Sequence, residues 1–126
     1  MAASGNVTIS GNVSNAPQGA ETFGPFTFLT AAAVANNVTQ TLTGGANTVT
    51  IPTGTTCLIL AGPNRTNPTP NPTVGATLTV KGIAGDTGIV FGSSGLVVFT
   101  WDAANPAPAT VIVNASIGCT LFVWSM

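Results

Sequence analysis

Residues 75–101, GATLTVKGIAGDTGIVFGSSGLVVFTW, constrain the fold most, because short apolar runs alternate there with glycine-rich turns. Thr77–Lys81 alternates polar with apolar residues, the period of two that is typical of a strand with one wet face and one dry face. Two runs rich in β-branched and aromatic residues follow, and Gly92–Gly95 separates them. The stretch therefore predicts three consecutive strands joined by tight turns.

The rest of the chain repeats this pattern. Turn signals recur about every 8–12 residues, which is typical of an all-β sandwich or barrel. Cys57–Ala61 is apolar on both faces and predicts a strand buried between two layers. Ala31–Ala35 offers at most one helical turn, because the run is too short to form a helix alone. We expect an all-β fold with essentially no helix: a single jelly-roll-like β-sandwich or a small barrel.

A chain of 126 residues fits one domain with an attached terminal segment. We expect residues 1–22 to form an extended N-terminal strand or arm and a linker, and residues 23–126 to form the sandwich. The repeated unit Gly-Asn-Val places Val7, Ile9 and Val13 on odd positions, as an extended strand would. These three residues are the predicted assembly arm.

The segment Gly62–Gly75 contains four prolines in a polar context, and each proline removes a backbone donor and disfavours helix. We expect an exposed and fairly stiff loop. Asn64, Arg65 and Asn67 are its predicted contact residues.

Charge is unusually scarce, at 4% of residues where soluble domains carry about 25%. A folded monomer of this mass exposes about 6,100 Å², which leaves one charge per ~1,200 Å². One side of a standard interface covers only about 800 Å². Whole interfaces therefore fit on this surface without burying a charge, which predicts a homo-oligomer, with a trimer preferred; an isolated module kept soluble by Thr, Asn, Ser and Gly is the alternative.

The same scarcity excludes several classes of partner. A net charge of −1 gives no cluster of Lys and Arg for nucleic acid. The apolar runs are shorter than the roughly 18 residues that a membrane span needs, and the N-terminus lacks the basic and apolar regions of a signal peptide. We expect no membrane contact and synthesis in a cytoplasm.

The residues that perform catalysis or bind metals are nearly absent. The chain has no His and only three carboxylates, Glu21, Asp86 and Asp102, so we expect neither an enzyme nor a bound metal or cofactor. Gly85–Gly88 could suggest a calcium or phosphate loop, but a lone carboxylate favours a tight turn capped by Asp86, with Gly88 at positive φ. Lys81 could pair with Asp86 across that turn.

Cys57 and Cys119 each lie inside an apolar run, which favours buried free thiols; a disulfide between neighbouring strands remains the alternative. Phe23, Phe26, Trp101 and Trp124 border apolar runs. Packing in the core or at its rim is the favoured role for these aromatics. An aromatic platform for a ligand is the second interpretation.

The segment LTVKGIAGDTGIVFGSSGLVVFTWD, preceded by TVTIPTGTTCLIL and followed by PAPATVIVNASIGCTLFVW, resembles small all-β virion proteins of tailed bacteriophages. The similarity covers residues 47–124. It implies a non-enzymatic structural protein that assembles symmetrically in a virion, as a capsid decoration protein bound to the major capsid protein or as a minor tail or fibre component.

Two functions follow, and the structure bears on the choice between them. A capsid decoration (cement) protein would present a flat apolar and threonine-rich face, and would bind the shell through that face and its N-terminal segment. A tail or fibre module that binds a receptor or carbohydrate would instead cluster exposed aromatic residues on its loops.

Overall fold

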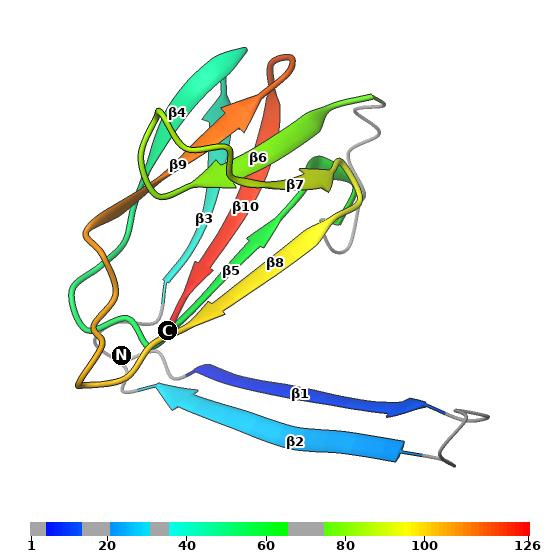
Figure 1. The fold of residues 1–126 in the computed structure, drawn as a ribbon, viewed down its shortest axis with the longest axis vertical. Helices are drawn as coiled ribbons and strands as arrows, with labels where there is room; N and C mark the ends of the chain where they lie inside the picture. Colours follow the sequence, from blue (N-terminus) through cyan, green and yellow to red (C-terminus); the bar gives the residue numbers. More distant parts are fainter. Residues whose placement is uncertain (1–4, 14–20, 31–35, 66–74) are drawn as a thin grey trace.

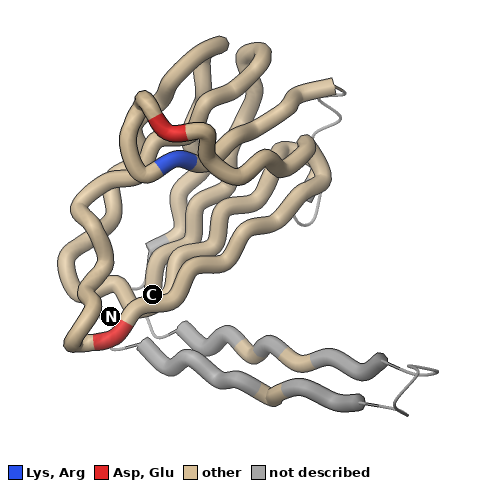
Figure 2. Tube along the Cα trace, in the orientation of Figure 1, with Lys and Arg blue, Asp and Glu red and all other residues tan. Residues whose placement is uncertain are grey.

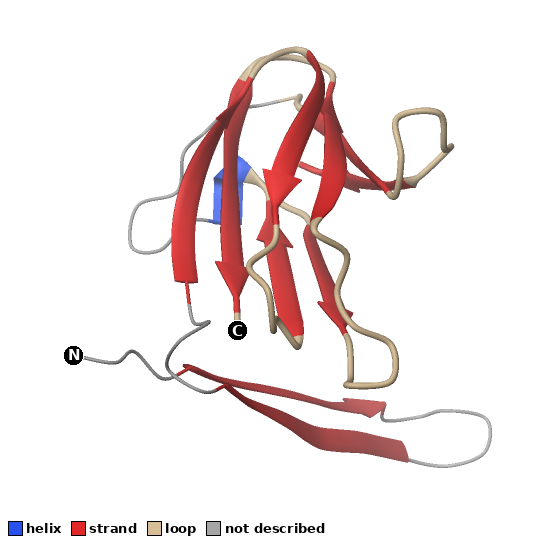
Figure 3. Ribbon diagram, turned by 90° about the vertical axis from the view of Figure 1, so that its left-hand side faces the viewer, coloured by secondary structure: helices blue, strands red, loops and turns tan. Residues whose placement is uncertain are grey.

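A computed structural model describes residues 5–13, 21–30, 36–65 and 75–126, which form ten strands and one 3₁₀ turn (Figures 1 and 3). The elements are β1 (Gly5–Val13), β2 (Glu21–Thr30), β3 (Asn36–Leu42), β4 (Gly45–Thr50), β5 (Cys57–Ala61), the 3₁₀ turn η1 (Pro63–Arg65), β6 (Thr77–Lys81), β7 (Ile89–Gly92), β8 (Leu96–Thr100), β9 (Thr110–Ala115) and β10 (Cys119–Ser125). No helix in this part of the chain is long and apolar enough to cross a membrane.

Eight of these strands form two antiparallel four-stranded sheets. Their orders are β3-β10-β5-β8 and β4-β9-β6-β7, and the two sheets face each other across a shared core (Figure 1). Each sheet keeps two edge strands, so the fold is an open sandwich and not a closed barrel. The prediction of an all-β sandwich is confirmed.

The pairing has a nested order. The strand pairs β3–β10, β4–β9, β5–β8 and β6–β7 are all antiparallel, so the chain is one long hairpin folded over on itself. Two further pairs, β10–β5 and β9–β6, join the folded hairpin into sheets. Eight strands wound in this way are a jelly roll, the more specific of the predicted architectures.

The core follows the alternation that the sequence predicts. In β6, Leu78 and Val80 are buried between the sheets, and the residues beside them are half-buried or exposed. Leucines from several strands make the largest contribution, namely Leu42, Leu58, Leu60, Leu78 and Leu121, each at most 1% exposed. All five residues of β5 are buried, so the predicted strand and its burial are confirmed; β5 lies within one of the two sheets, however, and only Leu58 and Leu60 face the core between them.

The turn predicted at Asp86 and Gly88 is confirmed, and a second turn is capped in the same way by Asp102. The Asp86 carboxylate accepts a hydrogen bond from the Ile83 amide at 3.0 Å, and Gly88 adopts a φ of 76°. The Lys81 ammonium donates to the Ala84 carbonyl at 3.5 Å; the described residues contain no Lys81–Asp86 ion pair. In the loop after β8, the Asp102 carboxylate accepts hydrogen bonds from the backbone amides of Ala104 and Asn105.

The N-terminal boundary differs from the expected one at residues 22 and 23. β2 pairs with β1 in a separate two-stranded sheet, and the first strand of the sandwich is β3, which begins at Asn36. The physical reason is that β2 finds its hydrogen-bonding partner in the preceding segment, so the expected arm is half of a hairpin. The helical turn considered at residues 31–35 lies outside the described residues.

Candidate functional site

The carboxylates in the sandwich are engaged in turns, and the described residues contain no group of His, Cys, Asp and Glu that could hold a metal ion. Asp86 caps the turn before β7. Hydrogen bonds from Asn105, through its backbone and side chain, and from the Ala104 amide lower the pKa of Asp102. Both carboxylates therefore accept hydrogen bonds within their own turns.

The outer face of the sheet β3-β10-β5-β8 carries two rows of apolar residues. The strand register aligns Trp124 with Ile59 and Val98 in one row, and Phe122 with Ala61 and Leu96 in the next. We call these six residues the apolar face. Because residues directly opposite in an antiparallel sheet share a face, the two rows lie side by side on the surface turned away from the core.

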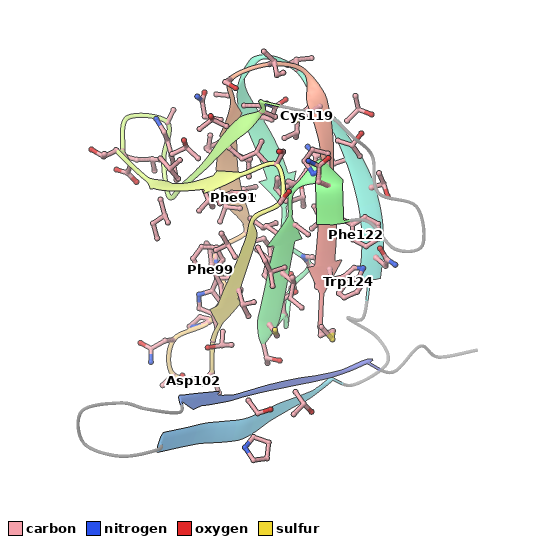
Figure 4. The ribbon with its side chains drawn as sticks, turned by 90° about the vertical axis from the view of Figure 1, so that its right-hand side faces the viewer. Phe91, Phe99, Asp102, Cys119, Phe122 and Trp124 are labelled. Atoms are coloured by element: carbon pink, nitrogen blue, oxygen red, sulfur yellow. The ribbon has the colours of Figure 1, made fainter. Side chains whose placement is uncertain are left out.

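The apolar face is partly a second core. Ile59 and Ala61 at its centre are 7% and 6% exposed, and Ile59 forms a small buried cluster with Cys57 and Met126. At its margins, Trp124 is 39% and Leu96 is 52% exposed. Phe122 and Trp124 contact each other edge to face, with ring centroids 5.4 Å apart, and lie on β10 apart from Phe91 and Phe99 (Figure 4).

The outer face of the opposite sheet has different chemistry. Its outward positions are mostly small and polar: Thr48, Thr50, Thr77, Thr79, Thr110 and Asn114. We call these six residues the threonine face. Ile112 and Val90 interrupt it, and Lys81 lies beside it. In Figure 2 the strands β10, β5 and β8 are tan throughout, and the charged residues lie outside them, around the β6–β7 turn and in the loop after β8.

A groove of about 500 Å³ opens between the two sheets on the side of β7 and β8. Its apolar wall includes Ile89, Phe99, Trp101 and Val111, and Lys81 and Asp86 lie at its rim. Phe99 and Trp101 stack with ring centroids 5.9 Å apart. This groove combines an aromatic surface with polar groups at one edge, which are the elements of a small-molecule site.

The predicted arm residues Val7, Ile9 and Val13 all lie on β1. The register places them opposite Phe28, Phe26 and Glu21 of β2. The arm is therefore already paired along one edge, and a further strand could add only at an outer edge of the hairpin. Phe23 also lies on β2, opposite Gly11.

The predicted loop contact residues have different positions. Asn64 lies in η1 and is half-buried, so its expected exposure is wrong. Its amide side chain donates to the Ser93 and Ser94 hydroxyls at 3.2 and 3.5 Å, and its backbone amide donates to the Ser93 carbonyl at 2.8 Å. These bonds hold η1 against the β7–β8 turn. Arg65 ends η1, and Asn67 lies outside the described residues.

Both cysteines are free and buried, as their apolar surroundings predict. Burial raises the pKa of the Cys57 thiol and of the Cys119 thiol. Neither thiol is therefore activated as a nucleophile.

In sequence and structure comparisons, no family model, curated protein or solved structure matches this chain. Sequence reasoning missed the apolar face, although one signal was present: CTLFVW in β10 is apolar at both inward and outward positions.

Proposed function

We propose that this chain is a non-enzymatic structural protein of a bacteriophage virion, most simply a capsid decoration protein that coats the head. Three features support the proposal: the resemblance over residues 47–124, the scarcity of charge, and the jelly-roll order of the strands, an architecture used by viral capsid proteins among others. The fold alone does not decide function, because lectins and cupins share it.

The observation that carries the proposal is the apolar face. Its exposed aromatic residue, Trp124, lies on a strand of a sheet and not on a loop. A flat apolar sheet surface suits lateral contact with another protein surface, whereas a receptor-binding module would place such residues on loops. The protein is thus made in the host cytoplasm and incorporated into the virion, where it binds the major capsid protein or another virion protein as a homo-oligomer, with a trimer preferred.

Copy number in purified particles tests this role. Quantitative mass analysis of the virion should find hundreds of copies, in a fixed ratio to the major shell protein. A handful of copies per particle would instead assign the chain to the tail and would overturn the decoration role.

Salt dependence tests how the protein is held. Attachment that depends on apolar burial and backbone hydrogen bonds should change little between about 0.1 M and 1 M salt, although the screening length falls from ~10 Å to ~3 Å. Deleting residues 1–14 should weaken binding to shells far more than Arg65→Ala or Lys81→Ala. Release of the protein by high salt, or full occupancy by the truncated form, would contradict this mode of attachment.

A second function has one observation in its favour. The groove with the stacked pair Phe99 and Trp101 suits a tail or fibre module that binds a receptor or carbohydrate, because sugar rings stack on exposed aromatic surfaces. Glycan-array binding that is lost in Trp101→Ala but kept in Trp124→Ala would support this alternative. An array without signal would remove it.

A further inference from the structure

The β1–β2 hairpin is a two-stranded sheet separate from the two sheets of the sandwich. Within the described residues, neither of its strands makes extensive contact with the two sheets, and the hairpin lies beyond one end of them (Figure 1). An isolated two-stranded hairpin is at best marginally stable in water, and it becomes stable when an apolar surface packs against it. The hairpin therefore needs such a surface, and the part of the chain that the structure describes provides none in extensive contact with it.

The register divides the hairpin into two unlike faces. Val7 pairs with Phe28, and Ile9 pairs with Phe26, so four large apolar residues share one face of the ribbon. On the other face Thr8 pairs with Thr27 and Asn6 pairs with Leu29, so that face is mainly polar, and Thr8 is exposed. One face of the ribbon thus has the composition of a core layer.

The apolar face of the sandwich matches this ribbon in chemistry. Its six residues are apolar, and the four residues of the ribbon face are apolar too, so packing the two together buries no charge. Packing between two sheet faces is a standard arrangement, with the sheets about 10 Å apart. The other outer face of the sandwich is a poorer partner, because threonine hydroxyls would lose water there.

We propose that the β1–β2 hairpin of one copy packs on the apolar face of a second copy of this chain. Each copy donates one hairpin and accepts one, so the exchange closes into a ring of two or more copies. This inference rests on the proposed structural role and deepens it: the apolar face joins neighbouring copies, and the outer edges of the hairpin are left to bind the shell. It is tested on the purified protein alone, so it stands or fails separately from the virion assignment.

The dimensions are compatible with a specific contact. A ribbon of two strands is about 10 Å wide and, at ~3.3 Å per residue, about 30 Å long, and a four-stranded face is about 20 Å across. One docked hairpin covers about 250 Å² on each surface, so a reciprocal pair buries about 1,000 Å² in total, the lower bound for a specific interface. A single unreciprocated hairpin, as between neighbours in a ring of three, buries half of that, so this contact favours a reciprocal dimer over the trimer expected from the sequence.

A matched pair of charge substitutions tests the acceptor surface. Leu96→Lys places a charge on the apolar face at a position that is 52% exposed, and Val90→Lys makes the corresponding change on the edge strand β7 of the other sheet, at 65% exposure. Both should fold, because both side chains already face solvent. In sedimentation experiments at tens of micromolar, Leu96→Lys should weaken self-association at least ten-fold and Val90→Lys should not. A monomeric parent protein, or equal effects of the two variants, would overturn the proposal.

Photocrosslinking distinguishes a hairpin that docks on a second copy from a hairpin that folds back onto the sandwich of its own chain. An unlabelled chain carrying a benzoylphenylalanine in place of Phe28 is mixed with a ¹⁵N-labelled chain that lacks the photoreactive group, and the adducts are identified by mass spectrometry. Adducts to labelled peptides containing Leu96 or Trp124 are the expected result. Adducts to unlabelled peptides alone would show that the hairpin covers its own sandwich, and adducts elsewhere or none at all would show that the apolar face is not its partner; each result rejects the exchange.

Discussion

The outer faces of the two sheets lie on opposite sides of the same sandwich and use the same antiparallel pairing, yet their chemistry differs. On β4-β9-β6-β7 the outward positions are mainly threonine, and the inward positions hold the core residues. On β3-β10-β5-β8 the central outward residues Ile59 and Ala61 are nearly as buried as the core itself. One sheet therefore has a polar outer face, whereas the other is apolar on both faces across β10, β5 and β8 and polar at its edge strand β3, where Asn37 and Thr39 continue the two rows.

The comparison shows where the stability of such a weakly charged chain resides. A sandwich needs only its inward faces to be apolar, and the threonine face follows that rule. The apolar face exceeds it, and its exposed margin at Leu96 and Trp124 is where we propose that a second copy packs.

An isoleucine-to-alanine substitution on each outer face should give the largest difference in unfolding free energy between the two faces. Ile59→Ala removes a buried outward side chain from the central strand β5 and should cost about 2–4 kcal/mol of unfolding free energy. Ile112→Ala changes a half-buried outward side chain on the central strand β9 and should cost about 1 kcal/mol. Denaturant unfolding of both variants gives the two values. If they agreed within about 0.5 kcal/mol, the apolar face would not be a second core.

The sequence was sufficient to predict the strands of the sandwich. Alternation in Thr77–Lys81 and uniform apolarity in Cys57–Ala61 are local signals, and both gave the correct strand and the correct burial. Turn residues such as Asp86 and Gly88 were predicted equally well, because their conformations depend on chemistry within a few residues.

The apolar face and the β1–β2 hairpin could not be predicted from the sequence. Both depend on which strands pair with each other, and no local pattern contains that information. The apolar face is formed by the register of β10, β5 and β8, which are far apart in the sequence. The four consecutive apolar residues Leu121–Trp124 of β10 also give no alternation from which to choose an inward face. In β2, Gly24-Pro25 interrupts the pattern, so the pairing of Glu21–Thr30 with β1 could not be anticipated.

The sheet with the threonine face is sensitive to close backbone packing. Gly88 precedes β7 at a φ of 76°, and a Cβ there would lie 2.5 Å from the Val80 carbonyl oxygen. Gly88→Ala should therefore cost about 1–3 kcal/mol through strain and displacement. Gly85→Ala is the matched control, because a Cβ there meets nothing within 4 Å. Thermal unfolding that ranked the two variants equally would contradict this account.

Thiol reactivity tests how Cys57 is protected behind the apolar face. Met126 belongs to the same buried cluster as Cys57 and Ile59, and its backbone bonds to that of Cys57. Met126→Ala should raise the rate of Cys57 modification by an aromatic disulfide reagent about ten-fold, which corresponds to ~1.4 kcal/mol of easier opening. Cys119 belongs to the core between the sheets and should keep its rate, so equal acceleration of both thiols would indicate general loosening instead.

The smallest expected effect concerns the charge of Asp102, in the loop that follows β8 at the rim of the sandwich. Its pKa is lowered from 3.8, first by the Asn105 backbone amide and then by the Asn105 side chain. A carboxylate whose folded-state pKa lies below its unfolded value stabilises the fold above the unfolded pKa, and loses that contribution as the pH falls through the folded pKa. Asp102→Ala should therefore lower the melting temperature slightly at pH 6, and the difference from the parent protein should shrink as the pH falls below 3.8. Melting curves between pH 2 and pH 6, in about 0.1 M salt to limit screening, measure the difference directly.

Because neither outer face gains or loses a charge in the Asp102→Ala variant, self-association should not change. A shift in self-association would mean that the rim takes part in the contact now assigned to the apolar face.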